Sequence, residues 1–425
     1  MEGQVNLSES TAAASRTFWS YWTAYSTSTV GSAITAVALP LTAVQVLHAD
    51  EFQTGLLAAA AHIAWLVIGL PAGAIVQRLP LRGAQVWTDV IRFLAILSVP
   101  VLWWMQMLTL VQLVVVALVI SFADVIFFVA SATFIPKVVP KDQLQGKNSL
   151  MSGTHAVAQL GGPSLGGILV QLFGPVLTVL IDAFSYLISA ILLRSMPETE
   201  RSSAPARSSI RTEIKEGLRF TLSDSVMRST LWNATIINFV GGAQLALFAI
   251  YLIRDLHAPA FVVGILLAME GVGALLGASL SSVLARTIGS ARACLLASAL
   301  LVVGAFITPM GHGYPGMVCF AFGSILFAAG TAITSTTTRT YRQLVTPPEL
   351  LSRVMGSVRF ISWGAVPVGS LAAGVLGSVL GSRETLFAAA FVGAASLLVL
   401  IFSPVGKLRD FPDQAAVRTP AGAAK

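Results

Sequence analysis

The sequence predicts an all-α membrane protein in which twelve transmembrane helices form two pseudo-symmetric bundles of six. Of its 425 residues, 55% are hydrophobic and 11% are charged, a balance that the surface of a soluble domain cannot accommodate. The apolar residues form runs of about 20, the length that a helix needs to cross a bilayer. Basic residues gather in alternate connections between these runs, and two segments of the first half recur in the second.

The twelve apolar runs divide the chain into two halves. The first six cover residues 18–47, 54–77, 85–106, 109–134, 148–173 and 176–195. The other six cover residues 229–253, 261–285, 288–309, 314–338, 354–380 and 384–404. The expected organisation is therefore an N-terminal half (18–195) and a C-terminal half (229–404), a central loop (196–228), and tails at 1–17 and 405–425. The first 17 residues lack the apolar core of a cleaved signal peptide, so the first helix is expected to target the chain to the membrane.

The basic residues predict the orientation of these helices. In the twelve-span topology 24 of the 26 Lys and Arg residues fall on one side, and only Arg254 and Arg383 fall on the other. Because basic loops remain in the cytoplasm, both termini are predicted to be cytoplasmic. The net charge of +7 thus reflects topology. Scattered basic loops without interleaved aromatic residues exclude a nucleic-acid site.

The central loop contains a candidate amphipathic helix. Apolar residues recur there every fourth position, at Ile210, Ile214, Leu218 and Leu222, with basic residues between them. This pattern is typical of a helix that lies on the membrane surface. A tether between the halves is the favoured role, and a site for a regulatory partner is the alternative. The preceding residues, 201–209, are rich in Ser, Ala and Pro.

A stripe of small residues marks the fifth run. Its packing residues are Ala158, Gly162, Pro163, Gly166 and Gly167. Small residues allow two membrane helices to approach closely, and a proline within the helix leaves one carbonyl group without its N–H partner. A kinked packing helix is therefore expected.

The two halves also resemble each other. Ala158, Gly162, Gly166 and Gly174 align with Ala365, Gly369, Ala373 and Gly381 at an offset of 207 residues. In the second and eighth runs, Gly55-Leu-Leu-Ala-Ala aligns with Gly264-Ile-Leu-Leu-Ala at an offset of 209. An offset of six helices gives both halves the same orientation, as in transporters whose repeats are related by an axis along the membrane normal.

Titratable residues within the runs are candidates for proton coupling. Inserting a carboxylate at the centre of a transmembrane helix into the bilayer costs on the order of 2.5 to 3.5 kcal/mol. The presence of Glu270 and Asp124 within predicted spans therefore indicates a function or a specific partner for each. In the repeat alignment the counterpart of Glu270 lies beside His62. Proton coupling is one interpretation, and a single buried hydrogen bond is the alternative, which is favoured for His62. Asp182 and Asp89 are weaker candidates. His155 could face the cytoplasmic side of a cavity, but a histidine satisfied by a neighbouring helix is favoured there.

Four charged residues around the third run are candidates for a cytoplasmic gate. They are Arg78, Arg82, Asp89 and Arg92. Asp89 and Arg92 have the i, i+3 spacing that allows an ion pair on one helix face, so a structural latch is favoured for them.

Polar residues in three runs are expected to line a substrate cavity. They are Tyr25, Ser28, Thr29 and Ser32 in the first run, Asn233, Asn238 and Gln244 in the seventh, and Thr331 and Thr334 in the tenth. A cavity with few charges and many apolar walls suits bulky amphipathic molecules better than sugars or phosphates.

These features resemble the major facilitator superfamily. The stretch 158–167 is similar to its antiporter signature, and Phe122-Ala-Asp124-Val and Leu180-Ile-Asp182-Ala-Phe-Ser-Tyr resemble its bacterial macrolide, multidrug and siderophore exporters. The resemblance implies a bacterial exporter in the cytoplasmic membrane that exchanges its substrate for protons.

The sequence departs from the superfamily pattern at two places. Gln77 replaces the acid usually found in the loop after the second span, which leaves Arg78 and Arg82 to bind carbonyl groups at helix C-termini. The fourth span lacks the embedded arginine of many proton antiporters. Proton coupling is therefore expected to depend on Glu270 and Asp124.

The leading hypothesis is a monomeric exporter of small hydrophobic or amphipathic compounds that works by alternating access and exchanges them for protons. The alternatives are a dedicated exporter of one metabolite, such as a siderophore or a self-made antibiotic, an uncoupled facilitator, and a non-transporting sensor or scaffold. An enzyme is not expected, because no HExxH, Walker loop or nucleophile elbow occurs. Two isolated cysteines match no metal-binding spacing, so neither metal nor cofactor is expected.

Overall fold

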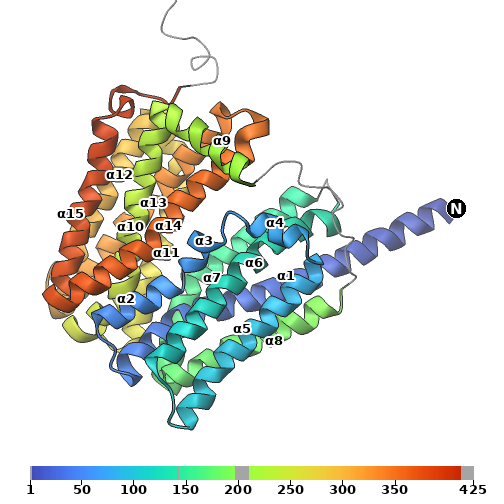
Figure 1. Ribbon diagram of the computed structural model, residues 1–425, viewed down its shortest axis with the longest axis horizontal. Coiled ribbons are helices and arrows are strands. Elements are labelled where there is room, and N and C mark those ends of the chain that lie inside the picture. Colours follow the sequence, from blue (N-terminus) through green and yellow to red (C-terminus); the bar gives the residue numbers. More distant parts are fainter. Residues whose placement is uncertain (1, 141–142, 197–209, 413–425) are drawn as a thin grey trace, which may run out of the picture. The chain divides into compact units, whose positions relative to one another are not determined.

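A computed structural model describes residues 2–140, 143–196 and 210–412, and these residues form helices and short connections without any strand (Figure 1). The chain divides into two compact units. The all-α class predicted from composition is therefore confirmed.

The first unit consists of Met1–Ala49, Ala60–Ala206 and Pro259–Ile265. Its elements are α1 (Glu2–Leu41), the π-helix η1 (Thr42–Val46), α3 (Ile63–Val67), α4 (Ala72–Gln77), α5 (Leu81–Trp104), α6 (Leu110–Val138), α7 (Leu144–Phe173) and α8 (Pro175–Arg194). Within it, α1 packs against α7 and α8, and α5 packs against α6 and α8.

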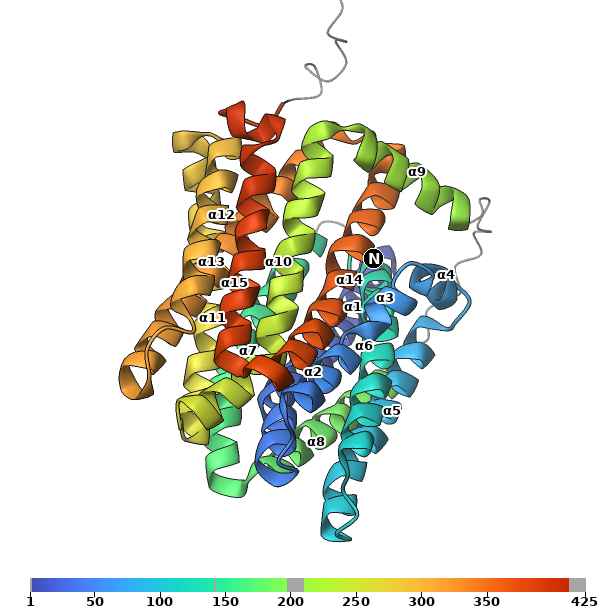
Figure 2. The ribbon, with the colours of Figure 1, turned by 60° about the vertical axis from the view of Figure 1, so that its left-hand side comes forward.

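The second unit consists of Asp50–Ala59, Arg207–Ala258 and Leu266–Lys425. Its elements are α2 (Glu51–Ala60), α9 (Ile210–Ser223), α10 (Ser225–Ile250), the π-helix η2 (Tyr251–Asp255), α11 (Ala260–Ile288, whose first residues belong to the first unit), α12 (Ser290–Ile307), α13 (Gly313–Val345), α14 (Pro348–Leu380), α15 (Ser382–Ile401) and the short 3₁₀ helix η3 (Pro404–Lys407). Here α10 packs against α14 and α15, and α12 packs against α13 and α15. Figure 2 shows α15 between α10 and α12.

The same packing pattern in both units confirms the internal repeat, and the backbone repeats in detail as well. Each π-helix is followed two residues later by a histidine with positive φ, His48 (53°) and His257 (53°), at the predicted offset of 209. Gly174 (φ 78°) and Gly381 (φ 91°) turn the chain between the last two helices of each half, at the predicted offset of 207. A residue with a Cβ atom rarely adopts this conformation, which explains the glycine at both turns.

Eleven helices among the described residues are long and apolar enough to cross a membrane. They correspond to eleven of the twelve predicted runs. The remaining run, 54–77, is not one helix but is divided among α2, α3 and α4. The helix is interrupted at His62 and again before Pro71, whose ring disfavours a helical conformation at the preceding residue.

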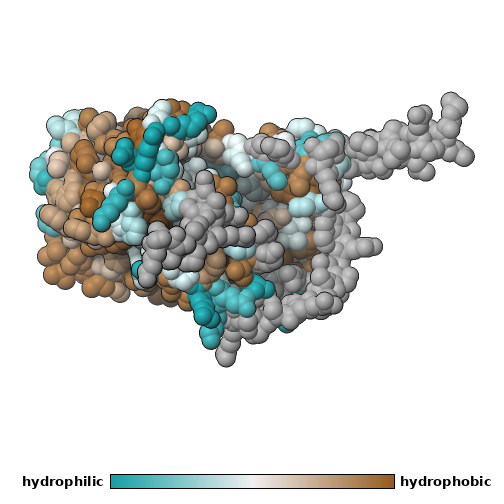
Figure 3. Space-filling model, turned by 90° about the horizontal axis from the view of Figure 1, so that it is seen from above, coloured by the Kyte–Doolittle hydropathy of each residue, from teal (hydrophilic) through white to brown (hydrophobic). Residues whose placement is uncertain are grey.

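Large hydrophobic side chains remain exposed on the outer faces of both units. Examples are Trp87 (67%), Phe184 (55%), Val379 (78%) and Phe391 (69%). Figure 3 shows one face of the molecule, where hydrophobic residues in brown surround scattered hydrophilic ones in teal. So much exposed apolar surface is typical of helices that face lipid.

The predicted amphipathic helix of the central loop is present as α9, which packs against α14 within the second unit. Gly217 brings the two backbones together, since a Cβ atom there would lie 2.4 Å from the carbonyl oxygen of Arg353. Glu216 forms an ion pair with Arg353 beside this contact. The Ser/Ala/Pro-rich stretch 201–209 lies outside the described residues.

Candidate functional site

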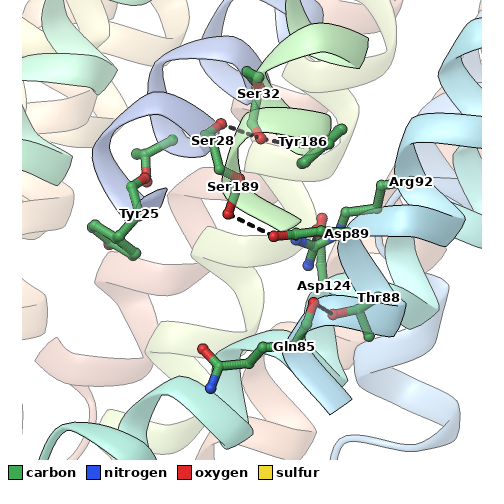
Figure 4. A network of polar contacts seen from close by, with 12 residues as sticks. Tyr25, Ser28, Ser32, Gln85, Thr88, Asp89, Arg92, Asp124, Tyr186 and Ser189 are labelled. Carbon is green, nitrogen blue, oxygen red and sulfur yellow. Dashed lines mark hydrogen bonds and ion pairs between the residues drawn. The ribbon is translucent and has the colours of Figure 1, made fainter. Parts of the chain in front are cut away.

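The first unit contains a network of buried polar side chains contributed by α1, α5, α6 and α8 (Figure 4). These helices pack against one another along faces that carry polar residues within otherwise apolar spans. A polar group in such a place must find partners inside the protein, because lipid provides none.

Arg92 of α5 lies at the centre of this network. Its side chain is only 3% exposed, and its Nη1 and Nη2 atoms lie 3.0 Å from Oδ1 of Asp89 and 2.7 Å from Oδ1 of Asp124. The guanidinium group also lies over the ring of Phe127, with 4.6 Å between Cζ and the ring centroid. The i, i+3 pair expected on this helix therefore forms, and it is joined by a carboxylate from α6.

The two carboxylates bound by Arg92 differ in their access to solvent. Asp89 is fully buried, and its Oδ2 atom accepts a hydrogen bond of 2.6 Å from Ser189 of α8. The side chain of Asp124 is 48% exposed. Asp124 is thus the more exposed of the two acids.

The predicted cavity residues of the first run lie on α1 beside this network. The Ser32 hydroxyl group lies 2.9 Å from the hydroxyl group of Tyr186, and Ser28 is buried one turn before it. Thr29 donates a hydrogen bond to the carbonyl oxygen of Tyr25. Figure 4 shows Tyr25, Ser28 and Ser32 along one stretch of α1.

The predicted cavity residues of the second unit lie in a buried but uncharged setting. Asn233 is fully buried and donates hydrogen bonds to Ser298 Oγ (3.2 Å) and to the carbonyl oxygen of Ser396 (3.0 Å). The side chains of Asn238 and Thr331 donate to carbonyl groups of their own helices. Among the described residues, the side-chain oxygen atoms of the buried Gln244 and Thr334 have no hydrogen-bond partner.

The repeat explains the difference between the units. At the offset of 209, Asp89 corresponds to Ser298, and at the offset of 207, Asp124 corresponds to Thr331. The positions of these two carboxylates thus hold hydroxyl groups in the second unit, so the repeated architecture carries different charges at these two places.

Glu270 and His62 occupy different settings. Glu270 lies on α11 in the second unit, is partly buried, and has no hydrogen bond or ion pair among the described residues. His62 lies at the break between α2 and α3, in the first unit, and interacts electrostatically with Asp124. The structure thus associates His62 with the network around Arg92.

The small-residue stripe packs α7 against α1. A Cβ atom on Gly162 would lie 2.3 Å from that of Ala33, and one on Gly166 would lie 3.1 Å from the carbonyl oxygen of Ile34. Ala158 is buried one turn earlier. In the second unit, Gly369 approaches the carbonyl oxygen of Phe239 on α10 in the same way, at 2.0 Å. The repeated stripe therefore joins the first and fifth spans within each half.

The opposite face of the small-residue stripe in α7 packs against the start of α11. A Cβ atom on Gly264 would lie 2.4 Å from the carbonyl oxygen of Pro163 and 2.7 Å from the Cα atom of Gly167. The repeat counterparts Gly55 and Gly374 make the matching contact, at 2.7 Å. Pro163 lies inside α7 without ending it.

The remaining gate candidates lie at the helix ends. Arg82 donates a hydrogen bond to the carbonyl oxygen of Met196, just beyond the C-terminus of α8, as expected for an arginine that has no acidic partner in its own loop. Arg78 is exposed at the end of α4. The side chain of Gln77 lies outside the part that the structure describes.

Sequence reasoning missed the central position of Arg92. The embedded arginine that the superfamily pattern puts in the fourth span comes instead from the third span, and it reaches Asp124 of the fourth. It also missed the polar face of α8, where Asp182, Ser185, Tyr186 and Ser189 are all buried. Their i, i+3, i+4, i+7 spacing inside an apolar span was a usable signal. Among the described residues, no group of His, Cys, Asp and Glu side chains is placed to hold a metal ion.

Comparison with known proteins decides the family. The family described as "transmembrane secretion effector", a group of major facilitator superfamily transporters, matches residues 9–421. The protein belongs to this family of transporters.

Several relatives of this transporter carry descriptive names. The multidrug efflux pump Tap of Mycolicibacterium fortuitum is 27% identical over 406 residues, which cover 90% of this chain and 94% of the relative. Tap of Mycobacterium tuberculosis is 25% identical over 421 residues, which cover 93% and 95%. YfiS of Bacillus subtilis, an uncharacterised MFS-type transporter, is 26% identical over 369 residues, which cover 84% of each chain.

Solved structures share the fold of this transporter at low identity. A bacterial homologue of the iron transporter ferroportin, in an inward-facing state, superposes with a TM-score of 0.73 at 18% identity and covers 91% of this chain and 98% of its own. The nucleoside transporter NupG superposes with a TM-score of 0.70 at 13% identity and covers 92% and 99%. These likenesses extend to the fold alone.

Proposed function

We propose that this transporter exports small hydrophobic or amphipathic compounds across the cytoplasmic membrane of a bacterium in exchange for protons, by alternating access and as a monomer. Both termini lie in the cytoplasm, as the distribution of basic residues predicts. The relatives named as multidrug efflux pumps support the substrate class and the direction of transport.

The half-exposed carboxylate of Asp124 beside the buried Arg92 is the observation that carries the proton coupling. When Asp124 is ionised, it shares the guanidinium group with Asp89 and ties α6 to α5. When Asp124 takes up a proton, its interaction with Arg92 is no longer an ion pair and weakens, while Asp89 still neutralises the arginine. Protonation therefore alters the contact between two helices, as it must if a proton is to favour one conformation over the other.

Glu270 provides a second acid for the C-terminal half in this proposal. It lies within α11 without an ion-pair partner among the described residues. Because no positive charge stabilises its ionised form, Glu270 can take up a proton and become neutral. His62 has the lesser role of adjusting the proton affinity of Asp124 through its electrostatic contact.

Proteoliposomes containing the purified protein test this proposal. With an imposed pH gradient, ethidium transport and the accompanying proton flux are measured with fluorescent indicators for Asp124→Asn, Glu270→Gln and the wild type. We expect Asp124→Asn to bind ethidium but to lose ethidium-driven proton flux, because the neutral amide cannot cycle between charge states.

The matched control is Glu384→Gln, which neutralises an exposed acid at the start of α15 and is expected to leave transport unchanged. Normal proton flux in Asp124→Asn would exclude Asp124 as the coupling residue. Normal flux in Glu270→Gln would remove Glu270 from the proposal.

A further inference from the structure

Asp182 of α8 is a second buried acid in the first unit that the proposed coupling step does not use. Its side chain is fully buried, and it lies on the same helix face as Ser185, Tyr186 and Ser189. This face connects it with the Arg92 network, because Ser189 binds Asp89 and the ring of Tyr186 lies 5.3 Å from the guanidinium carbon of Arg92.

The contacts of Asp182 leave one of its oxygen atoms without a partner. Oδ1 accepts a hydrogen bond of 3.0 Å from Ser185 Oγ. The backbone of α1 covers the carboxyl group, since a Cβ atom on Gly31 would lie 2.5 Å from Oδ1. Oδ2 has no hydrogen-bond partner in the described part of the chain.

A hydroxyl group without a partner lies beside this carboxyl group. Thr35 of α1 is 7% exposed, and its Oγ1 atom, which neighbours Asp182, makes no well-formed hydrogen bond to any described residue. Two buried polar atoms on facing helices are thus both unsatisfied, a situation that costs about 1 to 3 kcal/mol for each group.

The charges around Asp182 do not allow a third ionised carboxylate. Arg92 on α5 and Asp124 on α6 are the charged groups that act on it, Asp89 shares Arg92 with it, and Tyr186 is the further titratable neighbour. Only Arg92 is positive, and it already bonds to Asp89 and Asp124. With Asp182 ionised as well, three negative charges would face one positive charge in a desolvated interior.

We infer that Asp182 is a proton-storage site: it carries a proton on Oδ2 and donates it in a hydrogen bond to Thr35 Oγ1 while Asp89 and Asp124 are ionised around Arg92. This hydrogen bond satisfies both unpartnered atoms, and the proton reduces the net charge of the group of four residues from −2 to −1.

The role of this proton in transport rests on the proposed function. When Asp124 takes up a proton from outside, the net charge of the four residues rises from −1 to 0, and Asp182 can then release its own proton to the cytoplasmic side, which returns the net charge to −1. Hydroxyl groups lie within this network: Ser185 bonds to Asp182, Ser189 bonds to Asp89, and Ser32 lies within hydrogen-bond distance of Tyr186. Asp182 and Asp124 would thus hold the proton alternately.

Infrared difference spectroscopy of the full-length protein in lipid tests the storage site directly. At neutral pH the wild type is expected to show the C=O band of a protonated carboxyl group that exchanges slowly with deuterium. Asp182→Asn should lose this band. Asp124→Asn should shift the band, but at low pH the C=O band of the protonated Asp182 should still be present. An unchanged spectrum in Asp182→Asn would overturn the inference.

Thr35→Val provides a second measurement if Asp182→Asn does not fold. Removing the acceptor should shift the C=O band of Asp182, and an unshifted band would exclude the proposed hydrogen bond. Thr178→Val, which removes another buried hydroxyl group of α8 that bonds only to the carbonyl oxygen of Gly174, serves as the control and should leave the band in place.

These spectra do not depend on transport. If the wild type shows the slowly exchanging band but no proton flux with ethidium, the proposed exchange fails and the storage site stands. If ethidium drives proton flux and Asp182→Asn keeps both the band and the flux of the wild type, the storage site fails and the exchange stands.

Discussion

At the residue scale, the setting of each charge in the first unit follows from the number of its partners. Asp89 has two partners, Arg92 and Ser189, and is fully buried, whereas Asp124 shares Arg92 and remains half exposed. Breaking a buried ion pair by removing one partner costs about 3 to 5 kcal/mol, so the buried residue keeps its charge and the exposed one is free to change it.

Two adjacent glycines in α7 provide a test of close packing at this scale. In Gly162→Ala the new methyl group would lie 2.3 Å from the Cβ atom of Ala33, while in Gly161→Ala it would meet no atom within 4 Å. We expect Gly162→Ala to destabilise the protein by about 1 to 3 kcal/mol, because α7 must move away from α1.

Gly161→Ala is the matched control and is expected to be neutral or stabilising, since alanine favours a helix more than glycine does. Thermal unfolding in detergent, followed by tryptophan fluorescence, compares the two variants. Equal melting temperatures would contradict the packing of the stripe against α1.

At the element scale, α9 illustrates how a helix that appears amphipathic in sequence becomes attached to one unit. Its periodicity is local, and the helix was predictable for that reason. The position of α9 against α14 was not predictable from the sequence. The contact depends on Gly217, which meets the carbonyl group of Arg353, 136 residues later in the chain.

A pair of variants in α9 separates backbone contact from ion pairing. In Gly217→Ala the Cβ atom would lie 2.4 Å from the carbonyl oxygen of Arg353, which cannot rotate away, so α9 should detach and its amides should exchange hydrogen faster. Glu216→Gln removes only an ion pair whose carboxylate is 45% exposed, and its effect should stay within about 1 kcal/mol. Hydrogen exchange measured by mass spectrometry would contradict this account if Glu216→Gln had the larger effect.

At the scale of the whole molecule, the even number of spans and the distribution of basic residues have a testable consequence. The connection between α5 and α6, which includes Gln106, should face the outside, and both termini should face the cytoplasm. An alkaline phosphatase fusion at Gln106 should therefore be active, and one at the C-terminus should be inactive.

A green fluorescent protein fusion is the complementary measurement, because it folds only in the cytoplasm. It should fluoresce at the C-terminus and remain dark at Gln106. The opposite result would contradict the predicted topology, and a further fusion at the N-terminus would then distinguish an inverted chain from a run 54–77 that does not cross the membrane.

The sequence alone determined the class, the approximate bounds of eleven spans, the repeat and the amphipathic helix. Each of these depends on local information, namely hydrophobicity over about 20 residues, small-residue spacing and charge between runs. The interruption of the run 54–77 was less visible, since the hydrophobicity of that stretch is continuous although its backbone is not.

Only the tertiary structure decided which polar residues act together. Arg92 and Asp124 are 32 residues apart, and Ser189 and Asp89 are 100 apart, and no local pattern brings them to one place. The packing of α5 against α6 and α8 does so, because each helix turns its polar face away from lipid and toward the others. The sequence contained every carboxylate and the arginine, but the folded bundle determined which carboxylates share the arginine, which one stays accessible and which are buried.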